Sequence, residues 1–106
     1  MADDNDNGEL ESVKRSTIAT VKTKRAVVKR RITNTLKKLQ GTIEQYGRKS
    51  IILGYVNILE ESRNKAQVLN NQLLAMLPEQ EHENALNWYE EELERVQGVK
   101  LPIWFD

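Results

Sequence analysis

Residues 9–46 read ELESVKRSTIATVKTKRAVVKRRITNTLKKLQGTIEQY, and this stretch decides the fold. Apolar side chains recur along it in steps of three, four or seven, the spacing that aligns one face of an α-helix. The members of this face are Ile18, Val21, Val28, Ile32, Leu36, Leu39, Ile43 and Tyr46. The pattern predicts one long helix whose apolar face needs a partner.

Two further helices are predicted to supply that partner. Gly47 follows the first helix, Ser50 can cap the second, and Pro78 ends the second. The apolar residues of the second helix follow a near-heptad pattern: Ile52, Val56, Leu59, Ala66, Leu69, Leu73 and Leu77. Those of the third helix, which opens with three glutamates, are Leu86, Tyr89, Leu93 and Val96. Gly98 closes the third helix.

The chain of 106 residues is the size of one domain. We expect a disordered acidic start over residues 1–8, a helical bundle over residues 9–98, and an apolar tail over residues 99–106. The helices should span about residues 9–46, 50–77 and 79–97. The predicted class is all-α, a three-helix antiparallel bundle or coiled-coil hairpin. The tail is either extended and docked on the bundle or a link to further chain.

Short turns make neighbouring helices antiparallel, so residues at one level should have numbers of constant sum. The sum is about 95 for the first and second helices, which pairs Leu39 with Val56. It is about 155 for the second and third, which pairs Ala66 with Tyr89. Combining the two sums sets residue i of the first helix beside residue i plus 60 of the third, so that residues 29–31 lie level with residues 90–92 to within one residue.

Gly41 and Gly54 fall at one level of the first pairing. Glycine inside a helix costs about 1 kcal/mol relative to alanine, so a matched pair suggests a close approach of the two backbones. Two unrelated flexible points are the alternative.

Zero net charge conceals a division along the chain. Residues 1–13 hold five acids, residues 14–49 hold twelve Lys or Arg against one Glu, and residues 50–106 hold ten acids against four bases. Three interpretations remain open: neutralisation between helices, pairing with another copy, or a basic face for nucleic acid.

No motif in the sequence is typical of a catalytic, metal-binding or cofactor-binding site. His82 lies among glutamates with Leu86 four residues on, so we interpret it as a solvated or capping residue. Phosphate-binding loops, nucleophile elbows and metal-binding spacings are missing from the sequence. We therefore expect no enzyme activity, no catalytic residue, no metal, no cofactor and no small-molecule substrate. Without cysteine, a secretory signal or a bilayer-spanning stretch, the chain is expected to be soluble and intracellular, in the cytoplasm, with no membrane contact.

The basic segment allows binding to nucleic acid, which requires only a dense positive field. The candidate contacts are Lys29, Arg30, Arg31, Lys37 and Lys38. Aromatic residues that could stack on bases are not interleaved with them, and the acidic third helix would oppose binding.

The first helix should project beyond the bundle, because the end of the second helix falls level with Ile18. Residues 9–17 would fray alone, so a partner or a second copy should hold them if they are ordered. The candidate self-association residues are Lys14, Thr17, Ile18 and Val21.

The segments KTKRAVVKRRITNTLKKLQ (22–40), NWYEEELERV (87–96) and VKLP (99–102) carry a family resemblance. Together they resemble the N-terminal Gag-like region of BEL/Pao retrotransposon polyproteins, with its Ile-Thr pair at Ile32 and Thr33 and its Leu-Pro at Leu101 and Pro102. That family continues into a Pro-Phe element and a capsid-like part, whereas residues 103–106 here read IWFD. A fragment, a domesticated remnant and an unrelated helical protein all remain open. The resemblance implies a structural assembly role without enzyme activity.

The leading functional hypothesis is a structural, self-associating module of a Gag-like protein that contacts other proteins, most directly its own copies, through helical surfaces. A nucleic-acid-binding module and an adaptor that binds a partner helix are the alternatives. Both an intramolecular bundle and a swapped dimer satisfy the sequence pattern.

Overall fold

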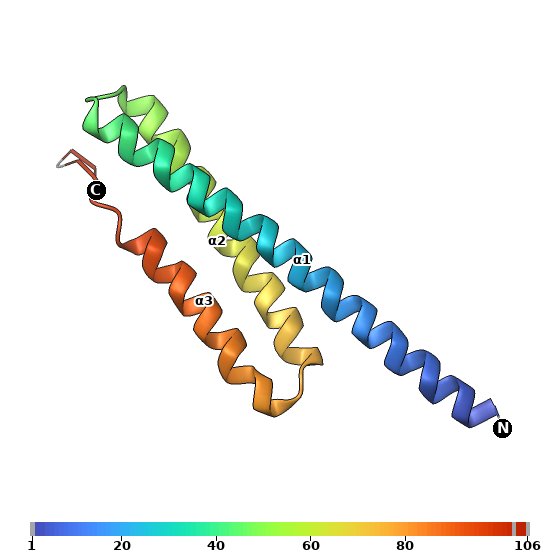
Figure 1. Cartoon of the computed structure of the whole chain (residues 1–106). Coiled ribbons are helices and arrows are strands. Elements are labelled where there is room, and N and C mark those ends of the chain that lie inside the picture. The colour runs from blue at the N-terminus through green and yellow to red at the C-terminus, as the bar shows by residue number, and fades with distance from the viewer. Residues whose placement is uncertain (1, 103, 106) are drawn as a thin grey trace.

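A computed structural model describes the backbone of residues 2–102, 104 and 105, and the side chains from residue 17 onward within that range. The described residues form three α-helices: α1 (Ala2–Glu44), α2 (Lys49–Met76) and α3 (His82–Gln97). A short 3-10 helix, η1 (Glu79–Glu81), precedes α3. The molecule is an elongated rod of 68 × 21 × 18 Å in which α2 and α3 pack beside α1 (Figure 1). The predicted all-α class is confirmed.

The α1 helix begins at Ala2, so residues 2–8 are helical where the sequence predicts disorder. Met1 lies outside the described residues. Carboxylates near a helix N-terminus interact favourably with the helix dipole, and Asp3, Asp4 and Asp6 occupy those positions. The polar composition therefore does not prevent the long helix from continuing to its start.

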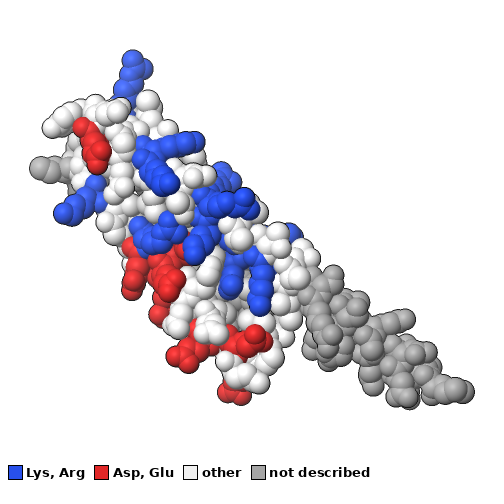
Figure 2. Space-filling model, viewed as in Figure 1, with Lys and Arg blue, Asp and Glu red and all other residues white. Residues whose placement is uncertain are grey.

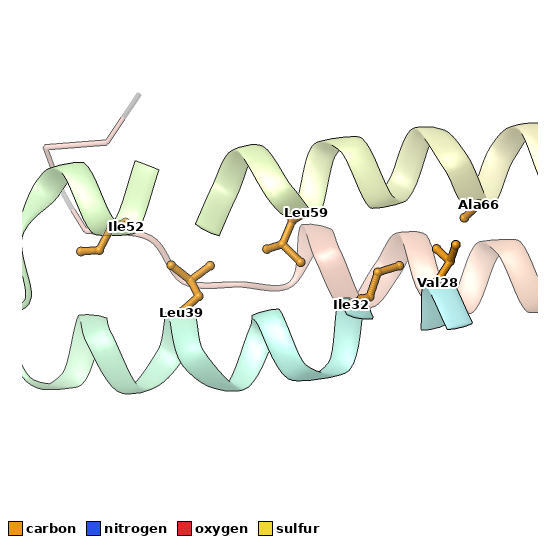
Figure 3. Close-up of a cluster of buried hydrophobic side chains, with 6 residues drawn as sticks. All are labelled: Val28, Ile32, Leu39, Ile52, Leu59 and Ala66. Carbon is orange, nitrogen blue, oxygen red and sulfur yellow. The ribbon is translucent and has the colours of Figure 1, made fainter. Parts of the chain in front are cut away.

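The core lies mainly between α1 and α2. Val28, Ile32 and Leu39 from α1 and Ile52, Leu59 and Ala66 from α2 form one buried cluster (Figure 3). Ala66 points toward Val28, and Leu59 lies between the levels of Leu39 and Ile32. The predicted register of the two helices is therefore correct to within about one residue. Partly buried side chains of α3, among them Tyr89 and Val96, complete the core.

The turn after α1 differs in detail from the prediction. The helix ends at Glu44, and Tyr46, not a glycine, adopts the left-handed conformation with φ 54°. The amide of Gly47 donates to the Thr42 carbonyl at 2.7 Å and that of Tyr46 to the Ile43 carbonyl at 3.1 Å, which is the Schellman pattern. A side chain at Gly47 would collide with the Thr42 side chain, so glycine is needed there for space.

Two other local predictions are wrong. Ser50 does not cap α2, which begins at Lys49 with Arg48 in the N-cap position and no side-chain cap. A Cβ atom added at Gly41 or Gly54 would meet no atom within 4 Å, so the two backbones do not approach closely there. Larger core side chains, such as Leu39 and Ile52, hold the two helices apart near this level.

The turn between α2 and α3 is closed by His82, whose Nε2 donates to the Leu77 carbonyl oxygen at 2.9 Å. This contact supports the interpretation of His82 as a capping residue.

The C-terminal tail packs on the bundle at the end where α1 meets α2 (Figure 1). Val99 and Leu101 pack against the core, and Phe105 lines a hollow with Leu39 and Val56. The ammonium of Lys49 lies 5.1 Å from the centre of the Trp104 ring. The tail is therefore docked, and it covers the part of the hairpin that α3 does not reach. Ile103 and Asp106 are outside the described residues.

Replacing Ser62 with alanine should stabilise the bundle. The side chain is buried, with 1% of its surface exposed, and its hydroxyl has no hydrogen-bond partner. Removing an unsatisfied buried hydroxyl should raise the free energy of unfolding by about 1 kcal/mol, measured by urea denaturation. Ser50→Ala, at an exposed position, is the control and should change little. A loss of stability in Ser62→Ala would show that the hydroxyl is satisfied.

Replacing Tyr46 with glycine should also stabilise the fold. Tyr46 is 96% exposed, so its side chain contributes little packing, while its left-handed backbone is strained. Thermal unfolding should show a gain of about 1 kcal/mol for Tyr46→Gly. Tyr46→Ala retains the Cβ atom and should show no such gain; equal effects of the two variants would contradict the strain.

Candidate functional site

A polar cluster on one flank of α1 fixes the position of α3. The Glu92 carboxylate, on a residue that is 2% exposed, accepts a hydrogen bond from Arg95 Nη1 at 2.8 Å, and the Lys29 ammonium lies 3.8 Å from its other oxygen. Arg95 Nη2 donates to the Thr33 hydroxyl at 2.6 Å, and that hydroxyl donates to the Lys29 carbonyl at 3.0 Å. The buried carboxylate is thus held by two cations from two helices.

Arg25 makes a second connection, in which one side chain reaches both other helices. Its Nη1 donates to the Asn70 side-chain oxygen of α2 at 3.4 Å, and its guanidinium lies 4.4 Å from the centre of the Trp88 ring of α3. Partial burial lowers the pKa of Arg25 below its ordinary value, because desolvation disfavours the charged form. The numbers of Arg25 and Asn70 sum to 95, the predicted register.

Fewer charged residues of α1 and α3 pair with each other than predicted. The contacting pairs differ by 62 or 63 in residue number, against the predicted 60. Lys29 consequently meets Glu92, while Glu90 and Glu91 are exposed and form no ion pair within the described part of the chain. Most of the acidic charge of α3 therefore remains on its surface, and Figure 2 shows acidic side chains gathered over α3 beside basic side chains over α1.

A groove between α1 and α2 lies on the other flank of α1. The residues on its walls are Thr23, Lys24, Val27, Val28, Asn64, Lys65, Val68 and Leu69, around a volume of about 510 Å³. Its floor is apolar: Val27 is 51% exposed and Val68 is 57% exposed. At about 100° per residue, Val27 and Lys24 fall on the side of the α1 core stripe opposite to the residues that contact α3.

A second hollow of about 510 Å³ continues the groove toward the α1–α2 turn. It is lined by Val27, Arg30, Arg31, Asn34, Thr35, Lys38 and Ile58. We call the two hollows together the open face. Five of its lining residues are Lys or Arg and none is Asp or Glu; the basic members are Lys24, Arg30, Arg31, Lys38 and Lys65. The arrangement can hold an apolar ligand surface that carries negative charge at its edges.

Only three of the five residues predicted to contact nucleic acid lie on the open face. Arg30, Arg31 and Lys38 line one hollow of the open face. Lys29 is directed to Glu92 of α3, and Lys37 is exposed but lines neither hollow.

The four residues predicted to take part in self-association also differ in their exposure. Val21 is 6% exposed and belongs to the core of its own chain, so it does not form part of a contact surface. Ile18 is half-buried and Thr17 is exposed, whereas the Lys14 side chain lies outside the described residues. Val21 is buried because it lies two residues inside the end of α2 in the observed register, where a neighbouring helix still covers it.

The sequence did not reveal the open face, because its most exposed apolar residues, Val27 and Val68, lie off the main stripes. A signal was present: Val27 and Val68 each adjoin a stripe residue, and Ile51, Ile58 and Lys65 recur every seven residues along α2. Together they form a second, weaker face.

Among the described residues, no group of three or more His, Cys, Asp or Glu could hold a metal ion. None of the helices in the described part of the chain has the length and apolarity to cross a membrane. Comparison with family models, with curated proteins and with solved structures found no match to this chain. The resemblance to the Gag-like region therefore stays a prediction.

Replacing Arg95 with methionine should destabilise the bundle through Glu92. The substitution retains much of the side-chain volume but leaves a buried carboxylate with only the more distant Lys29. Urea denaturation should show a loss of about 2 kcal/mol. Adding Glu92→Met removes the orphaned charge and should recover most of the loss. Additive losses in the double variant would contradict the coupling.

Proposed function

We propose that the chain is a non-enzymatic helical module that assembles with other protein chains, and most directly with copies of itself. The observation that carries this proposal is the open face, where half-exposed valines lie between two helices and are rimmed by lysine and arginine. The role matches the structural assembly that the Gag-like resemblance implies. We propose the cytoplasm as its compartment, because a chain without cysteine suits a reducing environment.

The shape of the open face suits an α-helix as its ligand. Grooves between antiparallel helices accept an amphipathic helix whose apolar side enters the groove. Covering Val27 and Val68 would remove apolar surface from water, which favours association at about 25 cal/mol per Å² before the cost of ordering. The rim would then select a ligand with acidic flanks.

The module requires no catalytic group. The charged side chains that meet at close range, Glu92, Arg95 and Lys29, join α3 to α1 and lie on the flank away from the open face. His82 is bonded to the Leu77 carbonyl oxygen at the turn. These groups are thus engaged in holding the helices together.

Nucleic-acid binding is the second candidate. Arg30, Arg31 and Lys38 gather in one hollow with no acidic residue on its walls, which favours phosphate contact. The apolar floor that includes Val27 and Ile58 speaks for protein, since phosphates and sugars gain little from it.

Sedimentation velocity from micromolar to millimolar protein tests self-association. We expect the weight-average mass to rise with concentration and to fall again at high salt, since exposed charge pairs are screened. A strictly monomeric chain over the whole range would contradict the proposal.

Fluorescence anisotropy with labelled RNA and DNA distinguishes nucleic-acid binding from self-association. Steeply salt-dependent binding by a chain that stays monomeric would favour nucleic acid. Arg30→Gln with Arg31→Gln should then reduce binding, while Lys100→Gln, on the docked tail, is the matched control.

A further inference from the structure

The described residues of the same chain leave the open face uncovered. The α3 helix lies against the other flank of α1, and the C-terminal tail packs at the end of the rod where α1 meets α2. Residues 2–16 cannot fold back over the open face, because they continue α1 as one unbroken helix. A helix from a second copy can therefore occupy this face.

The same chain carries a helical segment without a neighbouring helix. The α1 helix extends past the ends of α2 and α3 (Figure 1). In the observed register, Met76 at the end of α2 falls level with about residue 19, so residues 2–16 lie beyond the hairpin. A helix of this length is marginal in water unless something packs on it, and Gly8 weakens it further.

The composition of this segment complements the open face. Residues 2–16 hold five acids, all before residue 12, and two bases, Lys14 and Arg15, whereas the open face holds five bases with no acid. The acids are Asp3, Asp4, Asp6, Glu9 and Glu11. Leu10 and Val13, three residues apart, fall on one side of the helix and supply apolar groups for the valine floor.

The lengths also agree. At 1.5 Å per residue, the backbone from residue 2 to residue 16 is about 21 Å long. The open face runs along α1 from Thr23 to Lys38, which is about 22 Å by the same rise. One segment can therefore cover one open face from end to end.

We propose that residues 2–16 of one copy dock antiparallel on the open face of a second copy, and that the second copy does the same in return. This inference rests on the proposed self-association and names its partner and surface. Residue 16 then meets the region of Lys24 and residue 2 meets the region of Lys38, so paired positions sum to about 40. The result is a closed dimer with two-fold symmetry.

The charges exclude the simpler symmetric arrangement. Two open faces laid directly together would oppose five bases with five bases, and like charges across an interface disfavour binding. The reciprocal arrangement instead pairs each basic face with an acidic segment, and it leaves neither element uncovered.

The absence of cysteine from the sequence permits a direct test by disulfide formation. Val13 and Val27 have numbers that sum to 40, and Val27 is half-exposed. A mixture of the full-length variants Val13→Cys and Val27→Cys, oxidised at equilibrium, should give a crosslinked heterodimer well above either variant alone. Val13→Cys mixed with Leu86→Cys, which is exposed on α3, is the matched control and should not crosslink.

Charge reversal provides an independent readout. Arg31→Glu with Lys65→Glu should weaken dimerisation in sedimentation by about tenfold or more, and so should Glu9→Lys with Glu11→Lys, which lie at the same level in the proposed pairing. Mixing the two reversed proteins should restore association between them.

The outcomes separate the two proposals. Self-association that gives no Val13–Val27 crosslink and ignores the charge reversals would overturn this docking arrangement while leaving the assembly function standing. A chain that is monomeric at every concentration would overturn both. Association between the reversed proteins, together with the selective crosslink, would establish the arrangement.

Discussion

The buried seam between α1 and α2 is the interaction on which the other features depend. A helix as polar and basic as α1 gains little from its own composition, so its stability comes from packing Val28, Ile32 and Leu39 against α2. The short turn around Tyr46 fixes which residues meet, because it leaves almost no freedom to slide one helix along the other. Once this register is set, the two flanks of α1 are set as well.

The two flanks of α1 differ in what covers them. One flank receives α3 through the cluster of Glu92, Arg95 and Thr33 and through Arg25 over Trp88. Such contacts have strict geometry, so they specify where α3 lies more than they add stability. The other flank stays open and keeps its basic charge. The blocks of opposite charge in the sequence thus lie next to each other in the fold, with basic side chains over α1 and acidic ones over α3 (Figure 2).

The sequence could predict the features that follow from helical periodicity. Leu39 and Ala66 are core residues because they lie on stripes of three- and four-residue spacing, and the pairing sum follows from a short turn. The α3 register was displaced by two to three residues, because η1 and the Pro78 turn are not described by a sum of numbers. The backbone conformation of the first turn was not predicted correctly. Tyr46 adopts the left-handed conformation where a glycine was expected, since the Schellman bonds outweigh the side-chain strain.

The candidate site was less predictable than the core. Charge alone grouped Lys29 with Arg30 and Arg31, although consecutive helical residues point about 100° apart and only the last two line the open face. Val27 and Val68 could not be assigned to a site from the sequence. A valine outside the apolar stripe can be placed in a groove only when the position of the neighbouring helix is known. The sequence contains these residues, but only the packed hairpin gives them a common surface.

The central claim, that α1 and α2 of one chain pack in this register, is tested most directly by a nuclear Overhauser measurement between the methyl groups of Val28 and Ala66. The experiment uses methyl-labelled protein and, in parallel, a mixture of labelled and unlabelled chains filtered for contacts between molecules. A strong intramolecular signal between these two residues is the predicted result. Its absence, or its appearance only between different molecules, would contradict the bundle described above.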